Sequence, residues 1–195
     1  MRFTEIEHKF VVGDTFDLAG FGRALDALGP SRRSSVQVRD RYFLTRDGRA
    51  SAYIIRHRFD VELHELTIKS LVPDPEVRDE ITLDLSRGHG DQADAVDAFV
   101  ARMGLTWSGV VLKDLDVWYF PDCEVVHYVA SSASRTVRCV EFEARHSASL
   151  DDAFAVIERY ERATGLAGAT RSVDSIVALV FPEVSLPGTL FRPSR

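Results

Sequence analysis

The sequence has few cysteines, no long apolar run and no excess of basic residues, and each shortage excludes a class of protein. Two cysteines, Cys123 and Cys139, are too few for a disulfide scaffold and predict a reducing compartment. No apolar run approaches the length of about 18 residues that a membrane-spanning helix needs. The first ten residues, MRFTEIEHKF, carry charges where a secretory signal would be apolar. We therefore expect a cytoplasmic protein with no membrane contact.

The charge balance argues against a protein that binds nucleic acid over its whole surface. Lys and Arg number 24 against 30 Asp and Glu, which gives a net charge of −6. Nucleic-acid binders are usually basic. The six histidines show no compact metal-ligand spacing, and we expect them at the surface or on outer faces. A local basic pocket stays open, because net charge does not say where the charges lie.

The chain of 195 residues is long enough for one domain that folds without a disulfide or structural metal. We expect that domain to cover residues 1–181. The remaining residues, 182–195, contain three prolines and a glycine, and we expect a poorly ordered tail there.

Eight segments alternate between apolar and polar residues as strands do, and several are separated by short connections. They cover approximately residues 2–12, 35–45, 51–60, 62–71, 77–85, 108–120, 123–130 and 135–145. Residues 46–49 predict a hairpin turn. Residues 73–75, Pro-Asp-Pro, predict a loop, because proline cannot donate to a central strand ladder.

Helical spacing occurs in the remaining segments. Apolar residues recur at intervals of three and four over 18–28 and 96–103. Ser149 is a suitable N-cap for a helix that Gly165 ends, with two aspartates in its first turn, where the helix dipole favours acids. A shorter helix is expected over 172–180.

The charges on the strands are arranged unusually, because several of the predicted strands carry two or more charged residues on one face, often of both signs. In the first strand Glu5, Glu7 and Lys9 share a face. Arg39 and Arg41, and likewise Arg56 and Arg58, share faces on later strands. A sheet with one wet face is the simpler interpretation of any single strand. Eight antiparallel strands can instead close into a barrel with the charges inside and the helices outside. We expect this second architecture, a mainly β protein of the α+β class.

Such an interior would combine metal-binding acids with phosphate-binding bases. Two Glu-x-Glu pairs, one in the first strand and one in the last, could converge on a hard cation such as Mg²⁺ or Mn²⁺. The bases would then hold an anion, since arginine binds phosphate with two parallel hydrogen bonds. The acids are Glu5, Glu7, Glu141 and Glu143, and the bases are Lys9, Arg39, Arg41, Arg56, Arg58, Lys69, Arg78 and Lys113. Together they predict a metal-bound polyphosphate.

These motifs, in this order, resemble the CYTH superfamily of triphosphate tunnel metalloenzymes. The matching segments are Glu5-Ile6-Glu7-His8-Lys9, Arg56-His57-Arg58, Thr67-Ile68-Lys69, Arg78-Asp79-Glu80, Lys113 and Glu141-Phe142-Glu143. The resemblance covers approximately residues 3–180. It implies an eight-stranded antiparallel tunnel barrel and a small-molecule triphosphate substrate. Members are often dimers, which leaves a homodimer open.

The resemblance implies roles for individual residues. Metal binding falls to Glu5, Glu7, Glu80, Glu141 and Glu143, and catalysis to Glu5, Glu7, Lys9 and Glu80. Substrate binding falls to Lys9, Arg56, Arg58, Lys69, Arg78 and Lys113. Arg39 and Arg41 are added from the alternation. Arg135 is added as a substitute for residues that the family has and this chain lacks, with Arg138 and His127 as alternatives for that role.

The chain departs from the family pattern in its second half. The sixth strand reads Lys113-Asp114-Leu115 where many members have Lys-x-Arg, and the seventh strand lacks the usual Asp. The expected activity is metal-dependent hydrolysis of inorganic, thiamine or nucleoside triphosphate. Two alternatives stay open: a class IV adenylyl cyclase, and a non-catalytic module that binds polyphosphate or nucleotide.

Overall fold

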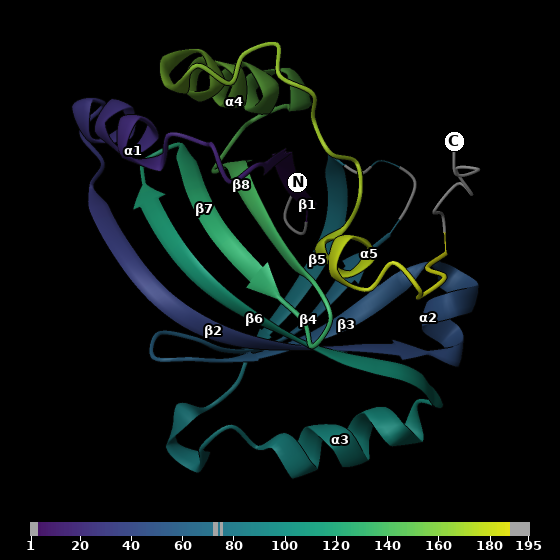
Figure 1. The fold of residues 1–195 in the computed structure, drawn as a ribbon. Helices are drawn as coiled ribbons and strands as arrows, with labels where there is room; N and C mark the ends of the chain where they lie inside the picture. The colour runs from purple at the N-terminus through teal and green to yellow at the C-terminus, as the bar shows by residue number, and fades with distance from the viewer. Residues whose placement is uncertain (1–3, 72–73, 75, 188–195) are drawn as a thin grey trace.

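Eight strands form a closed antiparallel barrel in the computed structural model, which describes residues 4–71, 74 and 76–187 (Figure 1). The strands are β1 (Thr4–Val12), β2 (Arg32–Thr45), β3 (Tyr53–Phe59), β4 (His64–Ser70), β5 (Val77–Asp84), β6 (Leu105–Tyr119), β7 (Cys123–Ser131) and β8 (Thr136–Ala144). Their order around the barrel is β1-β5-β4-β3-β2-β6-β7-β8, and β8 pairs with β1 to close it. The predicted eight-stranded barrel is confirmed.

Two helices cover one side of the barrel, one of them packed on β1 and β8 and the other packed beside it against β6 and β8. They are α1 (Leu18–Ala27) and α4 (Leu150–Thr164), and both lie on the same side of the barrel in Figure 1. Leu25 and Ile157 are fully buried together with Phe142 of β8. The Ser149 hydroxyl accepts a hydrogen bond from the Asp152 amide at 3.1 Å, and Gly165 ends α4 with a φ of 79°. Both predicted ends of this helix are therefore confirmed.

A buried contact between a histidine and a glutamate also ties α4 to the back of β1. His8 Nδ1 lies 2.6 Å from Glu161 Oε1, and both side chains are buried. Burial by itself raises the pKa of Glu161, but the hydrogen bond with His8 more than offsets this effect. The pKa is therefore lowered, and the carboxylate stays ionised. The predicted outer-face position of His8 is confirmed, but the helix covers it.

A third helix, α3 (Ala93–Arg102), covers β2 and β3, and a 3₁₀ turn, η1 (Arg87–His89), precedes it. Val96 and Val100 pack against Phe43 and Ile55. Phe99, which shares the predicted apolar spacing, is 56% exposed and does not belong to this cluster.

Residues 46–49 do not form the predicted hairpin turn. They begin a short helix, α2 (Arg46–Ser51), because the Thr45 hydroxyl accepts from the Gly48 amide at 3.0 Å. Ala52 then adopts a left-handed conformation with a φ of 54°, which ends α2 and leads into β3.

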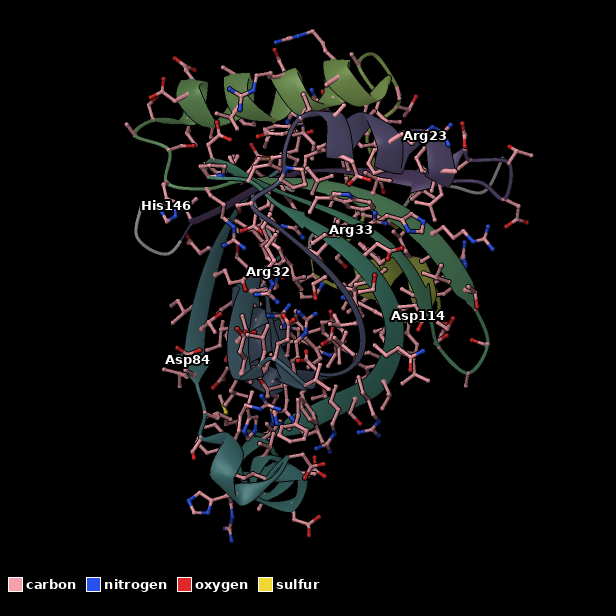
Figure 2. All side chains as sticks on the ribbon, turned by 90° about the vertical axis from the view of Figure 1, so that its left-hand side faces the viewer. Arg23, Arg32, Arg33, Asp84, Asp114 and His146 are labelled. Atoms are coloured by element: carbon pink, nitrogen blue, oxygen red, sulfur yellow. The ribbon has the colours of Figure 1, made fainter. Side chains whose placement is uncertain are left out.

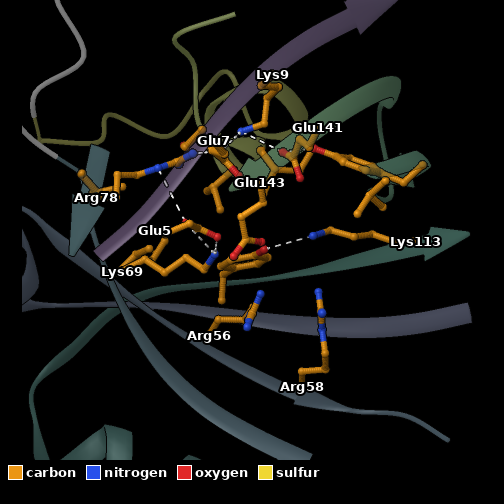
Figure 3. Close-up of a pocket in the computed structure, with 18 of the residues that line it drawn as sticks. Glu5, Glu7, Lys9, Arg56, Arg58, Lys69, Arg78, Lys113, Glu141 and Glu143 are labelled. Carbon is orange, nitrogen blue, oxygen red and sulfur yellow. Dashed lines mark hydrogen bonds and ion pairs between the residues drawn. The ribbon is translucent and has the colours of Figure 1, made fainter. Parts of the chain in front are cut away.

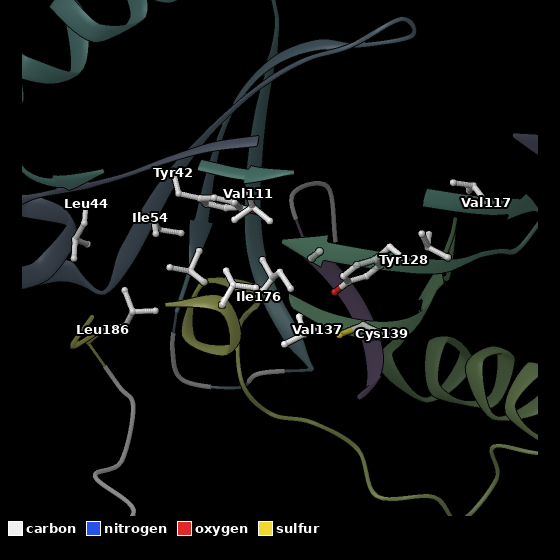
Figure 4. Close-up of a cluster of buried hydrophobic side chains, with 14 residues drawn as sticks. Tyr42, Leu44, Ile54, Val111, Val117, Tyr128, Val137, Cys139, Ile176 and Leu186 are labelled. Atoms are coloured by element: carbon white, nitrogen blue, oxygen red, sulfur yellow. The ribbon is translucent and has the colours of Figure 1, made fainter. Parts of the chain in front are cut away.

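The last helix, α5 (Ile176–Val180), is shorter than the predicted 172–180 and lies across one end of the barrel. Ile176 and Val177 pack against lumen-facing side chains such as Ile54 and Val126 (Figure 4). Leu186, after α5, belongs to the same apolar cluster. This end of the lumen is therefore filled by apolar packing.

Two expectations concern residues that the structure leaves undescribed. The Pro-Asp-Pro loop lies outside the described residues except for Asp74, and the predicted tail does so from residue 188 onward. The domain division after residue 181 stays a prediction. Among the described residues, no helix has the length and apolarity to cross a membrane.

We predict that Ile157→Ala lowers the free energy of unfolding by about 2–5 kcal/mol, because it leaves a cavity between α4 and the barrel. Urea denaturation measures the change. The neighbouring Glu158→Ala, on the exposed face of α4, should change stability by at most about 0.5 kcal/mol. Equal effects of the two substitutions would contradict this packing.

Candidate active site inside the barrel

A cavity of about 130 Å³ lies inside the barrel and is lined mainly by charged side chains (Figure 3). Its charged lining residues are Glu5, Glu7, Lys9, Arg56, Arg58, Lys69, Arg78, Lys113, Glu124, Glu141 and Glu143. All but Glu124 were candidate site residues from the sequence. The structure therefore brings together ten candidates from six strands, β1, β3, β4, β5, β6 and β8.

The pleat of β1 and β8 places their acids and bases side by side. Alternate residues of a strand share a face, so Glu5, Glu7 and Lys9 all reach the lumen. In the antiparallel register Glu7 lies opposite Glu143 and Lys9 lies opposite Glu141. Two like-charged carboxylates and one oppositely charged pair therefore stand next to each other across the same two strands.

Lys9 is the centre of one group of ion pairs. Its Nζ lies 3.1 Å from Glu7 Oε1 and 3.0 Å from Glu141 Oε1. Burial by itself lowers the pKa of Lys9, but Glu141 more than offsets it, so the pKa is raised. Arg78 also pairs with Glu7, and Tyr128 donates to Glu141 at 2.7 Å.

Lys69 is the centre of a second group. Its Nζ lies 3.0 Å from Glu5 Oε1 and 2.6 Å from Glu80 Oε2. Burial by itself raises the pKa of Glu5, but Lys69 and Arg78 lower it well below its ordinary value. Glu80 also lies 3.6 Å from Arg56. Glu80 therefore belongs to the ion-pair network in the barrel wall, although it does not line the cavity.

Asp40 holds two of the lumen bases and was missed from the sequence. It is fully buried and accepts from Arg58 Nε and Nη2 at 2.7 and 2.8 Å, while Lys113 Nζ lies 2.9 Å from its Oδ2. Burial by itself raises the pKa of Asp40, but Arg58 and Lys113 hold it well below its ordinary value. The carboxylate is therefore a fixed anchor for two candidate phosphate-binding side chains.

Three predicted substrate-binding arginines lie outside the cavity, and their predicted lumen position is wrong. On β2 the inward-facing residues are Asp40 and Tyr42, so Arg39 and Arg41 point outward. Arg41 pairs with Asp97 of α3, and Arg39 is exposed. Arg135 is exposed in the turn between β7 and β8. For Arg39 and Arg41 the prediction failed because it assumed that every charged face of a strand turns inward, and Arg135 lies outside the strands altogether.

A divalent cation fits the acids by chemistry, although the described residues hold no ready-made cluster of three metal-ligating side chains. The surroundings of Glu143 favour a bound cation. Burial and the charge of Glu5 raise its pKa to about 8. Its register partner is another carboxylate, Glu7, and like charges directly opposite one another are destabilising. Carboxylate oxygens are the ligands that Mg²⁺ and Mn²⁺ prefer. Glu5, Glu7 and Glu143 would hold such an ion.

Uncharged side chains complete the lining and were also missed. Leu115, Val126, Tyr128 and Ile176 face the same cavity. Leu115 occupies the position at which the resemblance would place the arginine of Lys-x-Arg in the sixth strand. The lumen is therefore charged on one side and apolar toward α5, and only the charged side had a signal in the sequence.

Comparison with known proteins identifies the fold. No family model matches the chain, and no curated protein matches its sequence. Solved structures do match. The PH1012 protein from Pyrococcus horikoshii OT3 has a TM-score of 0.73 at 18% identity, with 90% of this chain and 99% of that chain covered.

Two further structures have names that refer to an activity. HpAC1 from Hippeastrum, described with a dominant triphosphatase activity, has a TM-score of 0.60 at 15% identity, covering 95% of this chain and 99% of that one. A Bacillus halodurans protein, described as a proposed adenylate cyclase, has a TM-score of 0.60 at 17% identity, covering 92% and 99%. The chain shares the fold of these structures, and the eight-stranded antiparallel barrel that the resemblance implied is confirmed as its fold.

We predict that Asp40→Asn destabilises the protein by about 3 kcal/mol or more, since it leaves Arg58 and Lys113 buried without their counter-charge. The lowered pKa of Asp40 means that its contribution is present above the ordinary value of 3.8 and is lost as pH falls through the folded-state pKa. The difference in unfolding free energy between wild type and variant should therefore shrink below about pH 4.

Asp114→Asn is the matched control, because Asp114 lies on the next strand and binds Gln37 at an exposed position. It should shift the free energy of unfolding by no more than about 0.5 kcal/mol. An Asp40→Asn protein as stable as the Asp114→Asn protein at pH 7 would show that Asp40 does not anchor the two bases.

Proposed function

We propose that this protein hydrolyses a triphosphate inside the barrel with the help of a divalent metal ion, Mg²⁺ or Mn²⁺. The observation that carries the proposal is the convergence of six basic and five acidic side chains on one internal cavity. Phosphoryl transfer depends mainly on positioning and on neutralising the charge of the phosphates. A lumen of this composition meets both needs.

Arg56 and Lys69 can release their present partners when a substrate binds, whereas Asp40 keeps Arg58 and Lys113 in position. Arg56, Arg58, Lys69 and Lys113 now neutralise carboxylates of the protein. A triphosphate brings further negative charge, and a divalent ion on Glu5, Glu7 and Glu143 would offset it. The freed guanidinium and ammonium groups would then donate to phosphate oxygens, as arginine and lysine do in charge-assisted hydrogen bonds.

The reaction needs no nucleophilic side chain. Water attacks the terminal phosphorus, the bond to the bridging oxygen breaks, and phosphate and diphosphate leave when the substrate is inorganic triphosphate. The metal ion would supply charge neutralisation and would lower the pKa of bound water. The lumen bases would stabilise the charge that spreads over the phosphate oxygens in the transition state.

Cyclisation of ATP is the second candidate function. The likeness in fold to the proposed adenylate cyclase of Bacillus halodurans favours testing it. In that reaction the ribose 3′ oxygen attacks the α-phosphate and diphosphate leaves. Incubation with ATP and Mn²⁺ separates the two functions, because hydrolysis yields ADP and phosphate whereas cyclisation yields cyclic AMP and diphosphate. Tight binding of triphosphate without either product would instead support a non-catalytic module.

We predict that Glu143→Gln lowers the rate of metal-dependent phosphate release, or raises the metal concentration needed for half-maximal rate, by about 10- to 100-fold. The neutral amide removes the acid that has another carboxylate as its register partner. Phosphate release is measured during a titration with Mn²⁺. Glu158→Gln on the exposed face of α4 should leave the titration unchanged. A wild-type titration curve for Glu143→Gln would refute the metal role.

We predict that Arg56→Ala raises the KM for inorganic triphosphate by about 10-fold or more, since a hydrogen bond to a charged group contributes about 1.5–3 kcal/mol. Arg39→Ala is the control, because Arg39 lies on the neighbouring strand and is exposed outside the barrel. If KM and kcat of Arg56→Ala match those of Arg39→Ala, then Arg56 does not bind the phosphates.

A further inference from the structure

Four titratable side chains gather on the outer side of β1, directly behind two of its lumen residues, and the proposed reaction does not use them. They are His8 of β1, Glu76 just before β5, Glu161 of α4 and Arg171 of the segment between α4 and α5. Arg171 connects the others, because its Nη1 lies 3.5 Å from Glu76 Oε1 and its Nη2 lies 3.4 Å from Glu161 Oε2. The second oxygen of Glu161 lies 2.6 Å from His8 Nδ1. One guanidinium group thus joins an outer helix, the start of β5 and, through Glu161, the back of β1.

These groups lie at an interruption in the barrel wall. Among the described residues, β5 pairs with β1 only along Thr4–Ile6, because β5 begins opposite Ile6. The next inward residues of β1 are Glu7 and Lys9, whose backbone groups continue the same edge of the strand. The Glu7 amide donates to the Glu76 carbonyl at 3.0 Å. The Lys9 carbonyl accepts from the Ser172 amide at 2.7 Å. Two single hydrogen bonds therefore continue the wall beside this acid and this base.

Arg171 is connected to both of these hydrogen bonds. It pairs with the side chain of Glu76, and it directly precedes Ser172 in the chain. Figure 1 shows the chain running from α4 past β1 and β5 to α5. In the lumen, Glu7 and Lys9 lie 3.1 Å apart (Figure 3). A backbone shift at this edge would move both side chains, and a misplacement of about 1 Å can lower a rate about 100-fold.

The charges behind β1 give the physical reason for this connection. The carboxylates of Glu76 and Glu161 lie 3.7 and 2.6 Å from the two ring nitrogens of His8. Two carboxylates held this close repel each other, and Arg171 is a cation that pairs with both. Without the guanidinium group, the repulsion would push the start of β5 away from α4. The interruption in the wall lies between these two elements.

We propose that Arg171 is a positioning residue for the site in the lumen, because it holds the edge of β1 that carries Glu7 and Lys9. This inference rests on the proposed function and adds to it a residue that acts from outside the lumen. The Arg171 side chain does not line the cavity and is about one-third exposed. Its replacement therefore opens no cavity in the core.

The first test measures amide hydrogen exchange by NMR, which needs neither metal nor substrate. Arg171→Met removes the charge and keeps a side chain of similar length. The amides of Glu7 and Ser172 should exchange about 10-fold faster in this variant, because the edge of β1 opens locally more often. Amides of the β7–β8 ladder should keep their rates. Unchanged exchange at Glu7 and Ser172 would overturn the proposal.

The second test measures Mn²⁺ binding by electron paramagnetic resonance, together with the kinetics of triphosphate hydrolysis. Arg171→Met should weaken Mn²⁺ binding and lower kcat about 10- to 100-fold, the range for loss of a residue that supports a metal ligand. The KM for inorganic triphosphate should change less than about threefold, since Glu65 and Asp40 hold Arg56 and Arg58 on other strands. A raised KM with unchanged kcat and Mn²⁺ binding would contradict a positioning role.

Two further variants test the route through the carboxylates. Arg171→Lys keeps a positive charge and should recover part of the lost Mn²⁺ affinity, because an ammonium group can still pair with Glu76 or Glu161. Arg171→Met combined with Glu76→Gln should be no more defective than Arg171→Met alone, because both substitutions break the same connection. A lysine variant without recovery, or a double variant with fully additive losses, would exclude this route.

Arg33→Met is the matched control. Arg33 also ties the barrel wall to an outer helix, because its Nη1 lies 3.4 Å from Asp26 of α1. Figure 2 shows Arg33 on the barrel wall near α1, and its pairing strand is β2 rather than β1. The control variant should keep wild-type kcat, Mn²⁺ binding and exchange of the Glu7 amide. Equal losses in Arg33→Met and Arg171→Met would indicate a general loosening of the outer helices and would overturn the specific role of Arg171.

Failure of this inference and failure of the proposed function give different results. Active wild-type protein whose kcat and Mn²⁺ binding survive Arg171→Met overturns the positioning role and leaves the triphosphatase intact. Wild-type protein that neither binds Mn²⁺ nor hydrolyses inorganic triphosphate, ATP or thiamine triphosphate overturns the proposed function, and the positioning role with it.

Discussion

A buried charge is costly unless another charge neutralises it, and the interior of this barrel depends on such neutralisation throughout. Lys9 lies between Glu7 and Glu141, Lys69 lies between Glu5 and Glu80, and Asp40 holds two bases at once. The members come from seven of the eight strands, three of them from β1, so the network is complete only when β8 closes onto β1. Barrel closure and assembly of the site are therefore the same event.

The network neutralises its acids unequally, and this asymmetry is what suggests an activity. Glu143 has Arg145 at 3.3 Å, but another carboxylate, Glu7, is its register partner. Asp40, fully enclosed, fixes Arg58 and Lys113 in place. Glu143 has the opposite character, because burial and the charge of Glu5 raise its pKa to about 8. Such a site has positive groups held ready for an anion and negative charge that a cation would stabilise, and perturbed carboxylates of this kind cluster at functional sites.

Alternation in the sequence predicted the strands and most of the lumen, since a strand shows its two faces as every second residue. It could not say which face turns inward where both faces are polar. On β2 the sequence predicted that Arg39 and Arg41 face the lumen, but the aspartate between them, Asp40, does so instead. The sequence also did not predict the apolar part of the cavity lining near Leu115 and Ile176, because α5 reaches the end of the barrel only through tertiary packing.

The most direct measurement is a crystal structure with Mn²⁺ and an imidotriphosphate that resists hydrolysis, with the metal located by anomalous scattering. The account predicts phosphate density between Arg56, Arg58 and Lys69, a manganese peak at the carboxylate of Glu143, and the side chains of Lys69 and Glu5 separated from their present 3.0 Å contact. A lumen that keeps every internal ion pair at saturating ligand, with phosphate and metal bound elsewhere, would contradict it.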